Sequence, residues 1–378
     1  MNTFAKMKKN RIIILILPLI LTLNSCHVAR YFYWNLADFD DYKKFPAETI
    51  NKGDTAFHFI PSDSFISLNL PEGFCEGGFE NSFIDFLENT KTVALLIIKN
   101  DTLQFEHYSK GFQADAMVSS FSVSKSFVSA LVGIIIEEGY IKSVHQSVTD
   151  FIPELLNSDI RFSKITLEHL LNMQSGIRFN EGYSTPFSDM AKYYYGKNLK
   201  KYVGRLKIKS APGLEYDYVS VNSLLLGIVL ERVTGGSLAE LIEQRLWRPL
   251  GMEYDATWSL DSKKRGQIKA FCCLNSRALD MAKFGRLYLN RGNWNGLQVV
   301  PKRWIEATMK ADGNFCDSQG IPYSYGWRVK EDGAFFAKGI LGQYIYVFPD
   351  KEVIIVRLGK RSSGVDWVSF FEKLCSQL

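Results

Sequence analysis

Residues 119–127 read SSFSVSKSF and continue into an apolar segment, VSALVGIIIEEG. The apolar run predicts a buried helix from Phe127 to Gly139, and Lys125 lies in the turn that leads into it. A buried ammonium is costly unless it is paired or loses its charge, and a helix N-terminus favours anions over cations. A lysine at this position therefore indicates a chemical role.

Ser122 and Lys125 form a Ser-x-x-Lys pattern. Residues three apart share one face of a helix, so the hydroxyl and the amine can meet. Burial and the positive end of the helix dipole both favour the neutral amine, which can act as a general base for a serine nucleophile. The bare pattern is weak evidence, and the alternative is a surface lysine at a capped helix start.

Three further stretches follow the Ser-x-x-Lys pattern in a fixed order. They are TLEHLLNMQSG at 166–176, APGLEYDYVSVNSLLLGIVLERVTG at 211–235 and FFAKGILGQYIYVFPDKEVIIV at 335–356. Over roughly residues 80–378, this order resembles the serine hydrolases built on the class C β-lactamase and penicillin-binding fold. That group includes D-alanyl-D-alanine peptidases, esterases and 6-aminohexanoate-oligomer hydrolases.

The resemblance implies a β-lactamase/transpeptidase-like α/β fold, in which helices flank an antiparallel sheet and a large all-helical insertion interrupts it. It assigns Ser122 as the nucleophile and Lys125 as its base. The second family motif is Tyr-x-Asn after a Pro-Gly turn, and it falls on Tyr218 with Ser220 in the asparagine position. A phenol near an amine can pass a proton to the leaving group. Tyr216 is the local rival, and the Tyr-x-Ser form is similar to the esterase and aminohexanoate-hydrolase side of the family.

The third family motif is Lys-Thr-Gly or a version that contains histidine. The matching residues here are Ile340-Leu341-Gly342, so the usual cation is missing. Lys338 lies two residues before Ile340, and on a strand it would point to the same face. Lys338 is therefore a candidate substitute for the missing cation.

The resemblance also implies an oxyanion hole made by the backbone N–H groups of Ser122 and Gln343. Gly342 would leave room for the substrate to approach the strand, and Ser220 would contact it. These residues complete the expected substrate-binding set with Lys338.

Strands flank a helical middle in the predicted architecture. TVALLIIK at 92–99 and TLQFEHY at 102–108 predict a hairpin around Asn100-Asp101, and a second hairpin is predicted from GQYIYVF at 342–348 and EVIIVRLG at 352–359. Residues from about 140 to 290 are expected to be mostly helical. This pattern favours one α/β body at 81–378 with a helical insertion.

The N-terminus is typical of an export signal. Basic residues precede an apolar run from Ile12 to Leu23, which is short for a membrane span of about 20 residues. The ending Leu23-Asn24-Ser25-Cys26 resembles the bacterial lipoprotein cleavage site. This implies a signal peptide at 1–25, lipidation of Cys26, a lead-in at 26–80 and a place in the bacterial cell envelope. An uncleaved anchor is the alternative.

Composition excludes several other classes of protein. Without the four basic residues before the apolar run, 41 basic residues face 40 acidic ones, so nothing indicates nucleic-acid binding. The sequence has five histidines but no Gly-x-Ser-x-Gly motif, so nothing indicates a Ser-His-Asp hydrolase. No spacing of histidines and carboxylates indicates a metal site, and no cofactor is expected. His169 is expected to be a core histidine. The cysteines after Cys26 are expected to be mostly buried, with at most one disulfide: Cys75, Cys272, Cys273, Cys316 and Cys375.

The sequence therefore predicts a membrane-anchored serine hydrolase that acts through an acyl-enzyme on small-molecule or peptide substrates. Esters and amides are favoured over penicillins, because the third-motif cation is missing. A D-alanyl-D-alanine peptidase, a β-lactamase and a penicillin-binding sensor without turnover remain open alternatives.

Overall fold

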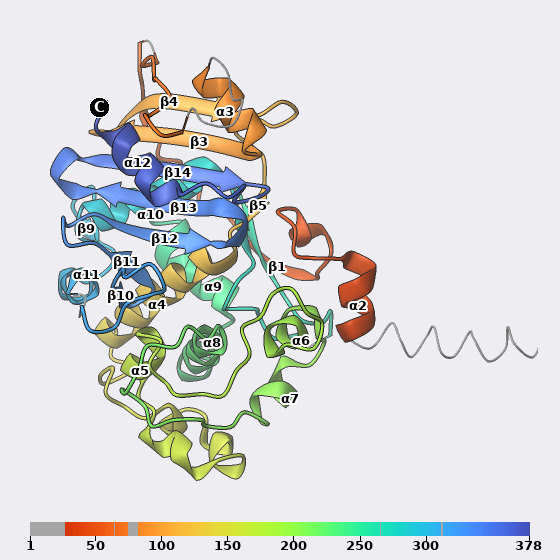
Figure 1. The fold of residues 1–378 in the computed structure, drawn as a ribbon. Helices are drawn as coiled ribbons and strands as arrows, with labels where there is room; N and C mark the ends of the chain where they lie inside the picture. Colours follow the sequence, from red (N-terminus) through yellow and green to blue (C-terminus); the bar gives the residue numbers. More distant parts are fainter. Residues whose placement is uncertain (1–26, 64, 75–81, 265, 311–312) are drawn as a thin grey trace, which may run out of the picture.

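The computed structural model of the chain describes residues 27–63, 65–74, 82–264, 266–310 and 313–378. Its centre is an eight-stranded sheet in the order β10-β11-β12-β13-β14-β3-β4-β2 (Figure 1). Neighbouring strands are antiparallel except for β2 and β4. The strand bounds are β2 Ile60–Pro61, β3 Thr92–Lys99, β4 Thr102–Tyr108, β10 Tyr323–Ser324, β11 Trp327–Val329, β12 Phe335–Gly339, β13 Gln343–Phe348 and β14 Val353–Gly359.

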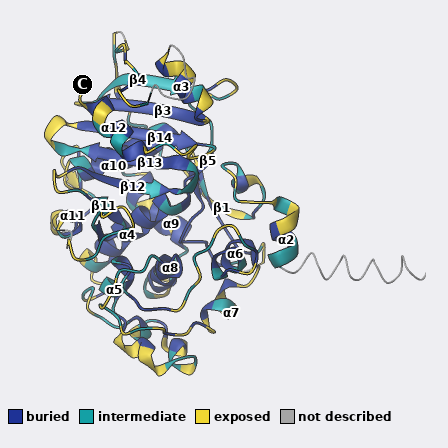
Figure 2. Ribbon diagram, viewed as in Figure 1, coloured by how far each residue is buried: buried dark blue, intermediate teal, exposed yellow. Residues whose placement is uncertain are grey.

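Both faces of this sheet are covered, which explains why β3 is apolar at nearly every position. Leu95 and Ile97 point to a cluster that includes α3 (Phe83–Asn89) and α12 (Trp367–Cys375). Leu96 points to the opposite cluster, which includes α4 (Ser124–Glu137) and α10 (Ala278–Leu289). Successive side chains on a strand alternate between faces, so two covered faces require apolar residues throughout. Figure 2 shows the buried sheet and the exposed outer loops.

Both predicted hairpins are confirmed, the first with the expected bounds and the second with each strand beginning one residue later than predicted. The buried helix begins at Ser124, three residues earlier than predicted. Helices and helical turns make up fewer than half of residues 140–290, so the region is less helical than predicted. Besides α10, they are η3 Val148–Asp150, η4 Pro153–Asn157, η5 Ile160–Lys164, α5 Leu167–Leu171, α6 Asp189–Tyr195, α7 Leu199–Val203, α8 Val221–Thr234, α9 Leu238–Ile242 and η6 Glu243–Trp247.

This region departs from the all-helical expectation in a second respect. β6 (Ala256–Ser259) and β7 (Leu274–Ser276) form a second sheet in the order β1-β6-β7-β5, with β1 at Ala47–Ile50 and β5 at Val118–Ser119. Strands of two to four residues are too short to show a period of two, so the sequence did not reveal them. The second sheet matters because β5 leads into the segment that carries Ser122.

The remaining described elements are short. They are α2 His27–Trp34, η1 Asp41–Lys43, η2 Phe121–Val123, β8 Asn293–Trp294, β9 Leu297–Gln298, α11 Lys302–Met309, η7 Ile340–Gly342 and η8 Pro349–Lys351. Among the described residues, no helix has the length and apolar character needed to cross a bilayer. The predicted signal peptide, the lipidation residue Cys26 and Cys75 lie outside the described residues.

Candidate active site

Ser122 lies in the short turn η2, between β5 and α4. The residue before it, Phe121, has a positive φ of 49°, a conformation that costs a non-glycine residue free energy and recurs at functional sites. Ser122 is half-buried, whereas Phe121 and Val123 on either side are buried. The strained turn therefore presents a serine hydroxyl at the start of a buried helix.

The amine of Lys125 contacts Ser122 as the spacing predicted. Lys125 Nζ lies 3.1 Å from Ser122 Oγ and donates to the carbonyl oxygen of Phe271 at 2.7 Å. The lysine is only 3% exposed, and its Nζ is 5.1 Å from the ring centroid of Tyr218. Two segments that are distant in the sequence thus bring a serine, a lysine and a tyrosine together, and a third segment holds the lysine through the Phe271 carbonyl.

Tyr216, the rival tyrosine, is placed differently. Its ring packs near Tyr323, with 5.7 Å between centroids, and its buried hydroxyl has no hydrogen-bond partner among the described residues. Tyr218 is the tyrosine whose ring faces Lys125. The count along the chain from the Pro-Gly turn therefore agrees with the geometry.

Glu181 is a polar residue of the site that the sequence analysis missed. Its carboxylate accepts hydrogen bonds from the backbone N–H and the hydroxyl of Ser220, at 2.8 and 2.5 Å, and from the hydroxyl of Tyr183 at 2.6 Å. Burial raises the pKa of Glu181, and the positive charge of Lys125 opposes that rise. The carboxylate of Glu181 therefore fixes Ser220 by two hydrogen bonds, and Ser220 lines the cavity.

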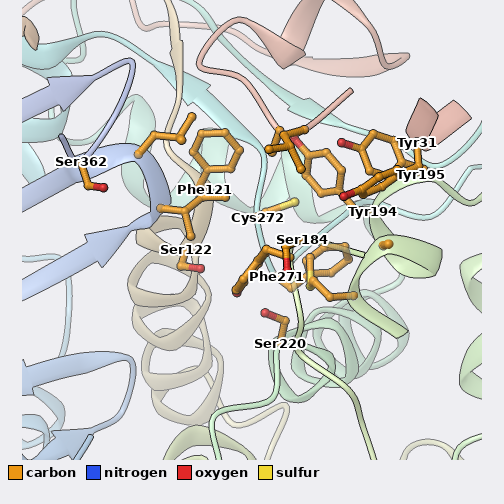
Figure 3. Close-up of a pocket in the computed structure, with 17 residues that line it drawn as sticks. Tyr31, Phe121, Ser122, Ser184, Tyr194, Tyr195, Ser220, Phe271, Cys272 and Ser362 are labelled. Atoms are coloured by element: carbon orange, nitrogen blue, oxygen red, sulfur yellow. The ribbon is translucent and has the colours of Figure 1, made fainter. Parts of the chain in front are cut away.

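The pair of Ser122 and Lys125 opens onto a cavity of about 320 Å³ (Figure 3). Ser122 lies on one side of it, and Tyr31, Tyr194 and Tyr195 lie on the other. The described residues that line it are Tyr31, Leu36, Ala37, Phe121, Ser122, Tyr183, Ser184, Met190, Ala191, Tyr194, Tyr195, Ser220, Phe271, Cys272, Ile340, Leu341 and Ser362. No charged side chain is among these described lining residues, so the cavity favours an apolar, neutral group.

The third-motif residues are arranged differently from the expectation. β12 ends at Gly339, and the chain turns through η7, in which Leu341 has a φ of 65°. Ile340 and Leu341 therefore reach the cavity, but Lys338 does not share their face. Its amine donates to Gln319 at 3.2 Å, so Lys338 does not replace the missing cation at the cavity wall.

Gln343 and Gly342 also lie outside the cavity wall. Gln343 is fully buried, and its side chain exchanges two hydrogen bonds with the backbone of Gly359. A Cβ on Gly342 would meet the guanidinium of Arg357 at 2.1 Å, so this glycine makes room for Arg357 rather than for substrate. Ile340 and Leu341 are the residues of this turn that line the cavity.

Gly339 brings the end of β12 close to the serine turn. A Cβ at Gly339 would lie 2.4 Å from the carbonyl oxygen of Ser120, a distance that real side chains do not tolerate. The absence of a side chain therefore lets the strand edge approach the segment before Ser122. This close approach differs from the one expected at Gly342, which was that of substrate to the strand.

The two adjacent cysteines form a disulfide between Cys272 and Cys273. Cys272 lines the cavity and directly follows Phe271, whose carbonyl holds Lys125. Of the other described cysteines, Cys375 is buried and Cys316 is half-buried. No group of three or more histidines, cysteines and acids among the described residues could hold a metal ion.

His169 lies in α5 and not deep in the core. Its Nδ1 accepts a hydrogen bond from the backbone N–H of Thr166, and the Thr166 hydroxyl accepts one from the backbone of His169. The two residues form a capping box at the helix N-terminus. His169 thus has a structural role, although the expected location was different.

Comparison with known proteins agrees with this site. Residues 79–368 match the Beta-lactamase family model, so the chain belongs to the β-lactamase family of serine hydrolases. A 6-aminohexanoate-dimer hydrolase from Paenarthrobacter ureafaciens is 29% identical over 293 residues, which cover 72% of this chain and 73% of that relative.

Solved structures extend the similarity to nearly the whole described chain. A Bacillus anthracis protein, provisionally assigned as a 6-aminohexanoate-dimer hydrolase, has a TM-score of 0.77 and 26% identity and covers 92% of this chain and 93% of its own. A family VIII carboxylesterase has a TM-score of 0.61 at 17% identity, covering 78% and 95% of the two chains. A class C β-lactamase has a TM-score of 0.58 at 16% identity, covering 77% and 92%. The last two establish the shared fold.

Proposed function

We propose that the protein hydrolyses neutral esters or amides with an apolar acyl group through an acyl-enzyme on Ser122. The observation that carries this proposal is the contact between Ser122 Oγ and Lys125 Nζ at 3.1 Å, at the wall of a cavity lined by uncharged side chains. Family membership supports the hydrolase chemistry. The 6-aminohexanoate-dimer hydrolase relatives support hydrolysis of an amide bond. Because a 6-aminohexanoate dimer itself carries a free carboxylate, the preference for neutral substrates rests on the cavity lining and not on these relatives.

In the proposed mechanism, Ser122 Oγ attacks the substrate carbonyl carbon while the amine of Lys125 takes the hydroxyl proton. The backbone N–H groups of Ser122 and Ile340 stabilise the oxyanion. Tyr218, next to Lys125, passes the proton to the departing alcohol or amine. Water then attacks the acyl-serine in the same way, which releases the carboxylic acid and restores the serine hydroxyl.

The apolar wall argues against substrates that carry a free carboxylate. A charge-assisted hydrogen bond to a substrate carboxylate is worth roughly 1.5–3 kcal/mol, or about ten- to a hundredfold in binding. Ile340 and Leu341 offer no such partner, and the amine of Lys338 bonds Gln319. A carboxylate in this cavity would lose its water without compensation.

The test compares kcat/KM for p-nitrophenyl butyrate with kcat/KM for a chromogenic cephalosporin. We expect the ester to be the better substrate by at least about tenfold, the lower end of the effect of a missing carboxylate partner. More efficient turnover of the cephalosporin would overturn the proposed preference. A cephalosporin adduct that never hydrolyses would instead indicate a penicillin-binding sensor.

We further propose that the protein is a lipoprotein of the bacterial cell envelope, held through Cys26. The basic start, the apolar run and the Leu-Asn-Ser-Cys ending of residues 23–26 support this. Metabolic labelling with an alkyne fatty acid should mark the parent protein and leave Cys26→Ala unmarked. Equal labelling of both proteins, or no labelling of the parent, would contradict the lipid anchor.

A further inference from the structure

The first described helix, α2, begins at His27, the residue directly after Cys26. It is fixed on the catalytic body and packs on α6 (Figure 1). Arg30 Nε donates to the carbonyl of Tyr195 at 2.5 Å, and the hydroxyl of Tyr195 donates to the carbonyl of Asn35 at 2.8 Å. No spacer residue therefore separates position 26 from the helix that is docked on the body.

The surface of α2 and its neighbouring loop is unusually apolar for an exposed face. Phe32 is 69% exposed, Tyr33 is 82% exposed, and Phe187 in the neighbouring loop is 80% exposed. The loop lies beside α2, since Tyr183 and Ser184 of the loop line the same cavity as Tyr31 and Leu36. We call Phe32, Tyr33, Leu36, Tyr183 and Phe187 the apolar rim. Aromatic side chains exposed in this way are typical of the interface between water and a bilayer.

Basic side chains lie next to the apolar rim. A shallow pocket beside α2 is lined by Trp34 and by four basic residues: Arg30, Lys44, Lys197 and Lys263. Asp261 also lines this pocket, and its carboxylate accepts a hydrogen bond from the backbone of Leu199. Lys44 is paired with Asp41, whereas Lys197 and Lys263 are exposed. This charge is complementary to anionic lipid headgroups.

Two of the five residues of the apolar rim also line the catalytic cavity, whereas Phe32, Tyr33 and Phe187 are not among its described lining residues. Leu36 and Tyr183 line the cavity that contains Ser122, together with Tyr31 of α2. In Figure 3, Tyr31 and Ser122 lie on opposite sides of that cavity. An apolar path therefore runs from the surface of α2 to the serine hydroxyl.

We propose that the apolar rim rests on the bilayer surface and that the cavity takes amphiphilic esters or amides directly from the membrane. This inference rests on the proposed function and adds that the substrate is amphiphilic and comes from the membrane. The substrate's apolar tail lies between α2 and Ser122, and its polar end remains near the basic side chains. Either form of the N-terminus, a lipidated Cys26 or an uncleaved anchor, holds α2 at the membrane surface.

The first test uses the full chain reconstituted in phosphatidylcholine vesicles that contain phosphatidylglycerol. Two substrates are compared: p-nitrophenyl palmitate dissolved in the vesicles and p-nitrophenyl butyrate in the water. The double variant Phe32→Ser/Tyr33→Ser should lose at least about fivefold in the rate on palmitate and change less than about twofold on butyrate, because fewer aromatic side chains hold the rim in the interface. A matched control, Ile160→Ser/Leu297→Ser, removes two apolar side chains that are 70% and 57% exposed on other faces. It should change neither rate.

An unchanged palmitate rate in the Phe32/Tyr33 variant would overturn membrane delivery while the butyrate rate still upheld the proposed function. A parent protein that hydrolyses neither ester would overturn both. A second measurement needs no turnover. A nitroxide attached at Phe32→Cys in a Cys316→Ser background should be more accessible to membrane-dissolved oxygen than to a water-soluble nickel chelate, and a nitroxide at Ile160→Cys should show the reverse. Equal, water-like accessibility at both positions would contradict the proposal.

Discussion

The two walls of the catalytic cavity are built in different ways. The reaction wall contains Ser122, Lys125 and the turn at Ile340, and it is held by a buried helix, a strained turn and the end of strand β12. The selection wall consists of α2, the loop around Tyr183 and α6, and it is aromatic and partly exposed. This difference indicates that the reacting groups are held by buried contacts, whereas the opposite wall offers the substrate a partly exposed aromatic surface.

The substitution Lys125→Ala tests most strongly whether the reaction wall supplies the chemistry. Removal of a proton-transfer group should lower kcat for p-nitrophenyl butyrate at least about a hundredfold. Lys338→Ala is the matched control, because Lys338 bonds Gln319 outside the cavity, and it should keep nearly the parent rate. Equal losses in the two variants would show that Lys125 is not the specific base.

The second comparison is between the two neighbouring tyrosines. Tyr218→Phe should lower kcat by about a hundredfold, the scale of a lost proton-transfer group, because the ring of Tyr218 lies beside Lys125 Nζ. Tyr216→Phe removes a buried hydroxyl that has no hydrogen-bond partner among the described residues and should leave kcat nearly unchanged. If Tyr216→Phe lowers kcat and Tyr218→Phe does not, the proton passes through Tyr216 instead of Tyr218.

A smaller effect is expected at Glu181, where the two walls meet. Glu181→Gln weakens charge-assisted hydrogen bonds from Ser220 and Tyr183, so kcat/KM should fall about tenfold. Burial raises the pKa of Glu181 above its ordinary 4.5. The carboxylate therefore forms at higher pH, and activity should fall as the pH drops through that raised pKa. The pH profile of Glu181→Gln should lack this fall in activity at low pH. A profile identical to that of the parent would show that Glu181 does not control the activity.

The least effect is expected from the adjacent cysteines. Cys272→Ala/Cys273→Ala removes a disulfide that closes almost no chain, and disulfide stabilisation grows with loop length. The free energy of unfolding should therefore fall by only about 1 kcal/mol in a urea titration, and kcat/KM should change less than about threefold. A tenfold loss of activity would instead mean that the disulfide positions the Phe271 carbonyl that holds Lys125.

The difference between the two walls also explains which residues of the site could be predicted from the sequence. Ser122 and Lys125 were predictable because their contact follows from a spacing of three on a helix start. Glu181 was not, because a loop residue reaches Ser220 only through the tertiary fold. The roles of Lys338, Gly342 and Gln343 depended on the residue at which β12 ends, and element boundaries are the least certain part of a sequence-based prediction.

The large sheet was easier to predict than the small one. The hairpin of β3 and β4 has long apolar strands around an Asn-Asp turn, which gives a clear pattern. β6 and β7 are held by pairing with β1 and β5, which lie far away in the sequence. Contacts of this kind leave almost no local signal, so the second sheet appeared only in the structure.

The central claim, an acyl-enzyme on Ser122, is tested most directly by intact-mass measurement after acid quenching of the reaction with p-nitrophenyl butyrate. The account predicts a butyryl adduct on the parent protein, located on the peptide that contains Ser122, and no adduct on Ser122→Ala. Lys125→Ala should acquire the adduct much more slowly. Ester turnover by Ser122→Ala at the parent rate, with no adduct on either protein, would contradict the account.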